Sequence, residues 1–346
     1  LGEMELAFLI MDKKAIGVTG TNGKTTVVTH VTDILCAHQI KARALGNIGT
    51  PLIEEVSNSS SDVFVIDMSS FQLETMQTPK LHSGCILNIT PDHLDRYHSM
   101  DDYARAKGGI CHAIHPKGRL YVESLTLEKW KPFFCHENLI SYGFTNKCGV
   151  SLIGNKINRF GLEECTLCES VMSKPIHDLE NFLATYALLR DMDLEAEEII
   201  DSFLSLKKPP HRIEFICELK GVSFFDDSKG TNIDAVIKAV TSMKGPVHLI
   251  AGGVDKGSSY SPWIPYFEGK VAKIFLIGQA KERIQKELSD TIPLELFDSL
   301  EAATEAAYRF AKTGDTILLS PGCSSFDMFR DYKHRGEEFK KIVSNL

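Results

Sequence analysis

The chain has 346 residues, with 38 Lys and Arg against 46 Asp and Glu, so its formal net charge is −8. Hydrophobic residues make up 43% and charged residues 24%, which excludes a disordered or fibrous chain. The acidic balance argues against a nucleic-acid-binding protein, which needs a basic surface to replace counterions. No apolar run reaches the roughly 18 residues of a membrane-spanning helix, so we expect no membrane partner.

Length and cysteine content bound the organisation further. A chain of this length is expected to form two domains of roughly 100–200 residues each. The nine cysteines are odd in number and follow no disulfide-framework spacing. Reduced thiols are therefore expected, which favours a cytoplasmic protein.

The first part of the chain alternates β-branched runs with stretches of helical period. The predicted strands are Ala15–Thr19, Val63–Met68, Cys85–Ile89 and Arg119–Val122, and the predicted helices are Thr25–His38, Met100–Ala113, Asn181–Asp191 and Leu194–Leu206. Such alternation favours a mainly parallel sheet covered on both faces. The less regular stretch Lys131–Leu179 predicts short strands and loops at the edge of that sheet.

A domain boundary is predicted at Lys207-Lys208-Pro209-Pro210, because two prolines cannot continue a helix. The alternation then restarts. Strands are expected at Glu214–Cys217, Val222–Phe225, Val247–Ala251, Lys273–Ile277 and Thr316–Ser320, and helices at Asn232–Ser242, Lys281–Leu288, Leu300–Ala311 and Arg335–Val343. The sequence thus predicts an α/β protein: a P-loop-type, mostly parallel-sheet domain over residues 1–208 and a smaller Rossmann-like domain over residues 209–346.

The most specific local motif is the glycine-rich stretch that runs from Gly17 to Thr26, between a predicted strand and a predicted helix. In this context backbone N–H groups and a helix N-terminus surround phosphate oxygens. Lys24 is expected to reach the terminal phosphates and the Thr25 hydroxyl to coordinate Mg²⁺. The candidate nucleotide-binding residues are Gly20, Thr21, Asn22, Gly23, Lys24, Thr25 and Thr26. The alternative is an ordinary glycine turn with a surface lysine.

A phosphate-binding loop needs a carboxylate on a neighbouring strand to hold the metal ion. Asp67 ends the apolar run Val63–Ile66 and supplies one, although a strand-end aspartate can also cap the next turn. Asn146-Lys147-Cys148-Gly149 lacks the acid of a GTPase base-reading element. The sequence therefore favours ATP over GTP.

Further motifs make the match specific, and with the phosphate loop they resemble the Mur ligase family. These motifs are Gly46-Asn47-Ile48-Gly49, Ser69-Ser70-Phe71-Gln72-Leu73, the stretch Asn88–Tyr97, Tyr103–Lys107, Pro210–Glu214, Asp227–Asn232 and Ser320–Asp327. The resemblance runs in consistent order from about Ala15 to about Phe339. The Ser-Ser-Phe-Gln-Leu and Asp-Ser-Lys stretches are most similar to the family member that adds D-glutamate.

The resemblance implies an ATP-dependent amide ligase of peptidoglycan precursor synthesis, and hence of cell-wall growth, cell shape and division. Its implied substrates are ATP, D-glutamate and UDP-N-acetylmuramoyl-L-alanine, and a monomer is expected. In the family the γ-phosphoryl group moves to the substrate carboxylate, and the amine of the amino acid then displaces phosphate. A carboxylate is a poor electrophile until one oxygen becomes a good leaving group, and Mg²⁺, Lys and Arg offset the repulsion between the anions.

The resemblance also implies a metal and catalytic set. Thr25 and Asp67 would hold one Mg²⁺, and His93 would join a second. Lys107 matches a lysine that CO₂ carbamylates in the family, which turns a cation into an anionic oxygen ligand. Lys24, His93 and Lys107 are thus the catalytic candidates. The alternative for His93 is a histidine that stabilises a turn, since Mg²⁺ prefers oxygen ligands over imidazole. The alternative for Lys107 is an exposed helix lysine.

Three substrate-binding groups follow from the same resemblance. Asn47, Ser69 and Gln72 match positions that contact the muramyl-alanine substrate, although loop capping explains each of them as well. Asn181, at the head of a predicted helix, and Arg212 and Asp227 match positions that contact ATP. The acceptor amino acid, with two carboxylates, is expected to use Lys229, Thr231, Lys256, Ser325 and the backbone N–H of Phe326.

Family members carry a further N-terminal domain that binds the uridine nucleotide. Because the phosphate loop starts as early as Gly17, we expect that domain to be absent from this chain and turnover to be weak. The rival hypotheses are another ligase of the superfamily, such as folylpolyglutamate synthase or a different Mur ligase, and a regulatory module that hydrolyses or merely senses ATP. A catalytically silent interaction domain is the third alternative. A zinc site at Cys165 and Cys168, completed by Cys148 and His177, is disfavoured because a second C-x-x-C pair is lacking.

Overall fold

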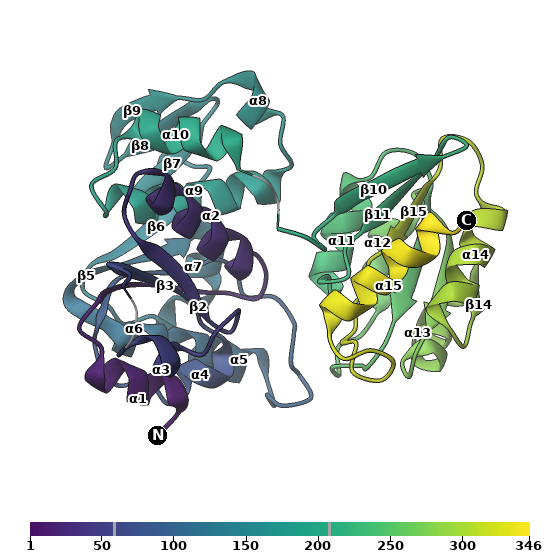
Figure 1. Ribbon diagram of the computed structural model, residues 1–346, viewed down its shortest axis with the longest axis horizontal. Helices are drawn as coiled ribbons and strands as arrows, with labels where there is room; N and C mark the ends of the chain where they lie inside the picture. Colours follow the sequence, from purple (N-terminus) through teal and green to yellow (C-terminus); the bar gives the residue numbers. More distant parts are fainter. Residues whose placement is uncertain (58–59, 207–208) are drawn as a thin grey trace. The chain divides into compact units, whose positions relative to one another are not determined.

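The computed structural model describes residues 1–57, 60–206 and 209–346, which form two compact units (Figure 1). Unit 1 is made of the described parts of Leu1–Ile89 and Ser99–Lys207, and unit 2 of Thr90–His98 and the described part of Lys208–Leu346. The predicted linker residues Lys207 and Lys208 lie outside the described residues.

Unit 1 is built on a sheet in the order β2-β3-β1-β4-β5-β6-β7-β8-β9, as far as the structure describes it. Neighbours from β2 to β7 run parallel, and β7, β8 and β9 are antiparallel to one another in turn. The strands are β1 (Lys14–Thr19), β2 (Ala42–Gly46), β3 (Val63–Asp67), β4 (Leu81–Ile86), β5 (Ile114–Glu123), β6 (Leu139–Gly143), β7 (Val150–Ile153), β8 (Lys156–Arg159) and β9 (Leu162–Thr166).

Helices cover this sheet because their apolar residues recur at helical spacing. The helices are α1 (Glu3–Ile10), α2 (Lys24–Ala37), α3 (Leu52–Glu55), α4 (Ser70–Leu73), α5 (Met100–Gly108), α6 (Ile110–Ala113), α7 (Ser124–Trp130), η1 (Lys131–Phe133), α8 (Glu169–Met172), α9 (Ile176–Arg190) and α10 (Ala196–Ser205). Val27, Val31 and Ile34 of α2 are fully buried in one core together with residues of α9 and α10. This core fixes α2, and therefore the loop before it, on the sheet.

Unit 2 has the strand order β10-β11-β15-β12-β13-β14, with β10 antiparallel and the others parallel to their neighbours. Its elements are β10 (Glu214–Leu219), β11 (Val222–Asp226), α11 (Ile233–Ser242), β12 (Val247–Gly252), η2 (Ser261–Trp263), α12 (Ile264–Phe267), β13 (Val271–Ile277), α13 (Lys281–Leu288), β14 (Leu294–Leu296), α14 (Leu300–Phe310), β15 (Thr316–Leu319) and α15 (Tyr332–Ser344). Trp263 and Ile284 belong to one buried core and Ala303 and Phe339 to another. Two cores indicate a three-layer α/β/α unit.

The predicted fold class is confirmed, as are the edge strands within 131–179. Two helix predictions were wrong in detail. The helix predicted over Met100–Ala113 is divided at Gly109 into α5 and α6, and α9 begins at Ile176, directly after Pro175. Asn181 therefore lies in the second turn of α9 and not at its head. The sequence reading also missed β2, whose residues Ala42–Gly46 carry no β-branched side chain.

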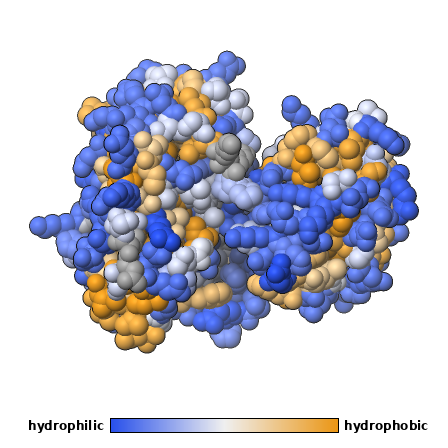
Figure 2. All heavy atoms as spheres, in the orientation of Figure 1, coloured by the Kyte–Doolittle hydropathy of each residue, from blue (hydrophilic) through white to orange (hydrophobic). Residues whose placement is uncertain are grey.

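The surface view shows hydrophilic residues interrupted by several hydrophobic patches, one of which lies at the lower left, over α1 (Figure 2). Leu6, Leu9 and Ile10 of this helix are exposed, whereas Met4 and Phe8 are buried. None of the described helices has the length and apolarity needed to cross a membrane.

One buried carboxylate anchors α1 to unit 1. Glu5 accepts hydrogen bonds from the backbone N–H groups of Gln77 (2.9 Å) and Thr78 (3.3 Å) and from the Thr78 hydroxyl (2.6 Å). Burial alone would raise the pKa of Glu5, but these hydrogen bonds outweigh it and hold the pKa below its usual value. The anchor is therefore strongest when Glu5 is ionised.

We predict that Glu5→Gln lowers the free energy of unfolding at pH 7 by about 1–3 kcal/mol, because an amide cannot accept all three hydrogen bonds. Since the folded-state pKa lies below the unfolded one, the contribution is present above the unfolded pKa and is lost as pH falls through the folded one. Urea denaturation of both proteins at pH 7 and at progressively lower pH measures this. A difference that does not shrink with acidity contradicts it.

Candidate functional site

The glycine-rich loop joins β1 to α2, and two of its glycines are sterically required. Gly20 has φ 146° and Gly23, which precedes α2, has φ 89°. A Cβ on Gly20 would lie 2.9 Å from the Leu87 Cβ, and one on Gly23 would clash with the Asn181 Oδ1. Glycine at both positions lets the chain turn directly into α2. The first N–H groups of α2 have no acceptor within the helix, as in phosphate-binding loops.

Asn88 holds the loop from the end of β4. The Thr21 N–H donates to the Asn88 carbonyl oxygen (2.7 Å), and the Asn22 N–H donates to the Asn88 side-chain oxygen (2.8 Å). The Asn88 side-chain amide donates in return to the Asn22 carbonyl oxygen (3.0 Å). Asn88 thus fixes the loop's outer turn, a role that sequence reasoning did not assign to it.

Two lysine ammonium groups converge on one carbonyl oxygen of the loop. Lys24 donates to the carbonyl oxygens of Gly20 (2.8 Å) and Thr21 (2.9 Å), and Lys107 of α5 donates to Gly20 (2.7 Å). Lys107 is 1% exposed, and its ammonium lies 4.7 Å from the centre of the Tyr103 ring. The interpretation of Lys107 as an exposed helix lysine was therefore wrong. Positive charge is concentrated where phosphate oxygens would bind.

Asp67 ends β3 and is fully buried. Its Oδ2 accepts a hydrogen bond from the Thr25 hydroxyl (2.9 Å), while its Oδ1 is buried and makes no hydrogen bond to any described residue. Leaving a buried carboxylate oxygen without a donor costs free energy. Because hard cations prefer such oxygens, Thr25 and Asp67 fit a Mg²⁺ ion. The Asp67 carboxylate thus accepts a hydrogen bond from Thr25, and it does not cap the turn that follows β3, which was the alternative interpretation.

Ser69 and Gln72 form a capping box at the start of α4. The Ser69 N–H and hydroxyl donate to the Gln72 side-chain oxygen (2.9 and 2.8 Å), and the Gln72 N–H donates weakly to the Ser69 hydroxyl (3.4 Å). The alternative interpretation, capping, thus describes what these two side chains do within unit 1. Asn47 is exposed, and its N–H donates to the Asp67 carbonyl oxygen (2.8 Å). Substrate contact by all three stays a prediction.

In unit 2 the predicted residues follow three neighbouring parallel strands, β11, β15 and β12. The carboxyl ends of such strands meet at one edge of the sheet, where α/β proteins bind ligands. An isolated bridge between Val254 and Ser324 joins two of these loops. The residues concerned are Asp227, Lys229 and Thr231 after β11, Lys256 after β12, and Ser325 and Phe326 after β15.

Within this loop cluster the side chains differ in exposure. The Lys256 ammonium donates to the Thr231 hydroxyl (3.3 Å), and Ser325 is buried. Phe326 is 74% exposed, and the Lys229 ammonium lies 4.9 Å from the centre of the Tyr332 ring. The structure thus brings Lys256 and Thr231 together directly.

Asp227 is a buried carboxyl group with a strongly shifted pKa. Its two oxygens accept hydrogen bonds from the Ser320 hydroxyl (2.7 Å) and the Ile213 N–H (3.3 Å). Burial raises its pKa to about 7, although the Ser320 hydrogen bond and the charge of Arg212 act in the opposite direction. Asp227 therefore titrates close to neutral pH.

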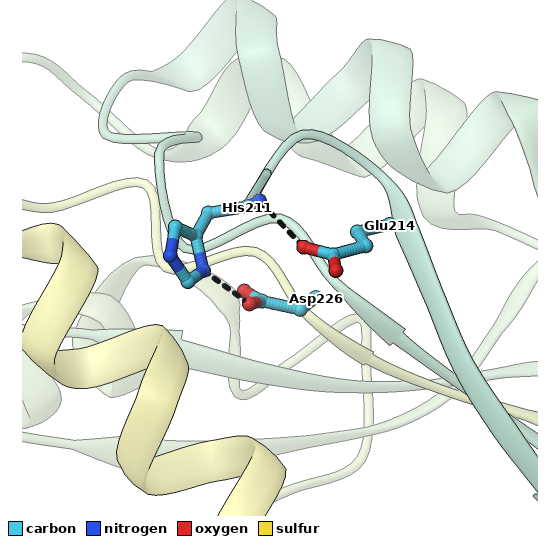
Figure 3. A group of neighbouring side chains, drawn as sticks. All are labelled: His211, Glu214 and Asp226. Carbon is cyan, nitrogen blue, oxygen red and sulfur yellow. Dashed lines mark hydrogen bonds and ion pairs between the residues drawn. The ribbon is translucent and has the colours of Figure 1, made fainter. Parts of the chain in front are cut away.

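His211, Glu214 and Asp226 form a cluster beside Arg212 and Asp227 (Figure 3). The His211 Nδ1 lies 2.6 Å from the Asp226 Oδ2, and the backbone N–H of His211 donates to the Glu214 Oε2 (2.8 Å). Two ligands of one metal ion, each about 2.1 Å from it, would lie roughly 3 Å or more apart. The cluster is therefore better described as a hydrogen-bonded network than as a metal centre.

This network positions the chain on either side of it. His211 has φ 61°, and a Cβ on Gly336 of α15 would clash with its ring. Lys340 of the same helix binds Glu214 (3.0 Å). The network thus fixes the segment that carries Arg212 against α15. The sequence analysis used Pro210–Glu214 as a family motif but did not predict this structural role.

His93 lies in the segment Thr90–His98, which belongs to unit 2, whereas Thr25, Asp67 and Lys107 belong to unit 1. It has φ 55°, its N–H donates to the Asp92 Oδ1 (3.0 Å), and its Nε2 lies 3.7 Å from the Asp92 Oδ2. A shared metal site of His93 and Lys107 stays a prediction.

Comparison with known proteins identifies the family. Residues 18–185 match the Mur ligase middle domain, and residues 211–323 match the domain described as "Mur ligase, glutamate ligase domain". The chain belongs to the Mur ligase family. The sequence-based family prediction, and with it the prediction of a ligase, is confirmed.

Named relatives agree with this assignment. The chain is 45% identical over 349 residues to the UDP-N-acetylmuramoylalanine–D-glutamate ligase of Protochlamydia amoebophila, and the match covers 100% of the chain and 78% of that relative. It is 39% identical to the protein of the same name from Caldicellulosiruptor saccharolyticus, with coverage of 100% and 79%.

Solved structures confirm the fold of this Mur ligase chain. The MurF ligase of Thermotoga maritima in complex with ADP has a TM-score of 0.73 and 17% identity, over 99% of this chain and 84% of that one. FolC of E. coli, in complex with DHPP and ADP, has a TM-score of 0.69 and 16% identity, over 100% and 93%. At such identities the likeness shows the fold alone.

We predict that the stability gain from Asp227→Asn increases with pH. Because the folded-state pKa is raised to about 7, ionising Asp227 costs stability as pH rises from its usual range to about 7. The asparagine does not ionise, so the variant should gain about 2–4 kcal/mol relative to the parent between pH 4 and pH 8. Urea denaturation across this range measures the gain, and a difference between the two proteins that is constant with pH contradicts the shift.

Proposed function

We propose that this chain is the ATP-dependent ligase that adds D-glutamate to UDP-N-acetylmuramoyl-L-alanine in peptidoglycan precursor synthesis. The observation that carries the proposal is the pairing of Thr25 with Asp67 beside a loop on which Lys24 and Lys107 converge. The choice of D-glutamate is supported by the relatives at 45% and 39% identity that bear this activity in their name.

ATP is proposed to bind with its phosphates at the loop from Gly20 to Thr26. Lys24 supplies positive charge to the terminal phosphates in exchange for its bonds to loop carbonyl oxygens. Asn181 lies against Gly23 at the base of the loop. Arg212 and Asp227 of unit 2 are proposed to contact the nucleotide as well, Asp227 through a ribose hydroxyl.

Thr25 and Asp67 are proposed to hold Mg²⁺, and His93 and Lys107 a second ion. Bound there, Mg²⁺ supplies charge neutralisation between the γ-phosphate and the substrate carboxylate. Lys107 is proposed to be carbamylated: its neutral amine adds to CO₂ and releases a proton, so a buried cation becomes an anionic ligand. The carbamate keeps one N–H, which can still donate to the Gly20 carbonyl oxygen, whereas the contact of the ammonium with the Tyr103 ring is given up.

The chain's own residues are proposed to align three reactants. Asn47, Ser69 and Gln72 hold the muramyl-alanine carboxylate, which takes the γ-phosphoryl group to give an acyl phosphate and ADP. Lys229, Thr231, Lys256, Ser325 and the Phe326 N–H bind the carboxylates of D-glutamate. The amine then attacks the acyl carbon, the amide bond forms, and phosphate leaves. Orientation of bound reactants accounts for much of such an acceleration.

We propose that the reaction takes place in the cytoplasm. All nine cysteines are free thiols, which suits a reducing cytoplasm. The monomeric state stays a prediction. A ligase of the folylpolyglutamate synthase type, with the fold of FolC, is the second candidate, but this likeness has 16% identity against 45% for the D-glutamate ligase.

We predict that Asp67→Asn raises the Mg²⁺ concentration that half-saturates ATP binding by about tenfold, because the amide removes an anionic ligand. Titration of ATP binding by calorimetry at a series of Mg²⁺ concentrations measures this. Asp62→Asn is the matched control, since Asp62 is exposed directly before β3. Equal Mg²⁺ requirements in the two variants would exclude Asp67 as a ligand.

We predict that phosphate release from ATP depends on D-glutamate in the presence of Mg²⁺ and UDP-N-acetylmuramoyl-L-alanine. L-glutamate, L-alanine and diaminopimelate should support release at least about tenfold less well. Lys24→Ala, which removes the phosphate-facing cation, should lower release at least about a hundredfold and serves as the control for contaminating ATPases. Release without any acceptor would favour the regulatory-module hypothesis, and release with L-glutamate and a folate would favour the second candidate.

A further inference from the structure

Lys256, the central residue of the proposed acceptor site, is bound by a carboxylate of the chain itself. The Asp92 Oδ1 lies 3.1 Å from the Lys256 ammonium, and Asp92 is 6% exposed. The two residues stand 164 positions apart, and both belong to unit 2. The ion pair is therefore a tertiary contact that the fold of unit 2 creates.

The groups around Asp92 are those that a substrate carboxylate would use. Lys256 contacts the Thr231 hydroxyl (3.3 Å), and the Asn232 side-chain amide lies 3.4 Å from the Asp92 Oδ2. Asn232 caps α11 by accepting a hydrogen bond from the Ala235 N–H (2.9 Å), so its amide N–H₂ group faces the carboxylate at a helix N-terminus. A cation, an amide donor and the positive end of a helix together favour one anion.

We propose that Asp92 occupies the acceptor-carboxylate position, and that D-glutamate binds by exchanging one of its carboxylates for Asp92 on Lys256. This inference rests on the proposed function, which assigns Lys256 and Thr231 to the acceptor. Asp92 thereby sets the strength of acceptor binding: a ligand must place a carboxylate on Lys256 that competes with it. Molecules without one leave the ion pair intact.

The backbone around Asp92 allows this exchange without undocking the segment. The Asp95 N–H donates to the Lys256 carbonyl oxygen (3.2 Å). Gly257 has φ 81°, and a Cβ there would lie 3.1 Å from the Asp95 nitrogen, so the two loops lie in close backbone contact. These backbone contacts hold residues 94–95 whichever carboxylate Lys256 binds.

The exchange also reaches His93. The His93 N–H donates to the Asp92 Oδ1, the same oxygen that binds Lys256. When Asp92 leaves Lys256, we expect this hydrogen bond to break. Acceptor binding is thus coupled to the backbone conformation of the proposed metal ligand His93, whose φ of 55° is already unusual.

The test is titration of D-glutamate into the full chain with Mg²⁺, a non-hydrolysable ATP analogue and UDP-N-acetylmuramoyl-L-alanine. Asp92→Asn should bind D-glutamate about three- to tenfold more tightly than the parent, because the internal competitor loses its charge. Asp95→Asn makes the same charge change at an exposed site of the same segment and should leave the affinity unchanged. Unchanged or weaker binding by Asp92→Asn overturns the inference.

The variant Lys256→Ala distinguishes a failure of the carboxylate exchange from a failure of the proposed acceptor site. Loss of D-glutamate affinity in this variant, with no gain in Asp92→Asn, overturns the exchange and leaves the acceptor site in place. Unchanged affinity in Lys256→Ala overturns the acceptor site itself.

Amide hydrogen exchange on the unsubstituted protein gives a second readout that needs no variant. D-glutamate should accelerate exchange at His93, and unaltered exchange under saturation contradicts the displacement of Asp92.

Discussion

The convergence of two ammonium groups on the Gly20 carbonyl oxygen is the constraint on which the first unit depends. Lys24 and Lys107 come from different helices, and Lys107 is almost completely buried. A buried cation costs free energy unless oxygens surround it. The turn at Gly20 and Gly23 supplies those oxygens, and Asn88 holds the turn in place. The phosphate binding proposed at this loop would rely on the positive charge that the fold gathers there.

In the second unit the predicted ligand-binding residues gather at one edge of a parallel sheet. Parallel strands bring the loops after β11, β15 and β12 to one edge, where Asp227 and Lys256 lie. Burial raises the pKa of Asp227 to about 7, because it opposes ionisation more strongly than the Ser320 hydrogen bond and the charge of Arg212 favour it. The buried guanidinium of Arg335, on α15, donates to Ser228 and to the Cys323 carbonyl oxygen, and so links two of these loops. Helix α15 thus sets the spacing of the site without contributing a predicted ligand-binding residue.

Local chemistry explains what the sequence could predict. Gly20, Gly23, Lys24 and Thr25 act within one turn, so their spacing alone predicts the loop, and Ser69 with Gln72 was open to a capping interpretation from the start. Contacts between distant positions could not be predicted in this way. Lys107 meets Gly20 across 87 positions, and Asp92 meets Lys256 across 164. The assignment of Thr90–His98 to unit 2 depends on such a contact, so no local pattern could show it.

Both units solve one electrostatic problem alike. Two of the cations proposed to bind a ligand oxygen already bind an oxygen of the chain: Lys24 the Gly20 carbonyl oxygen, and Lys256 the Asp92 carboxylate. Internal oxygens keep the cations from being buried without a partner, which would destabilise the fold by several kcal/mol, roughly 3–5. They also mean that a ligand gains only the difference between its own oxygen and the internal one. A carbonyl oxygen is a weaker competitor than a carboxylate, so phosphate has the easier exchange and the acceptor carboxylate the harder one.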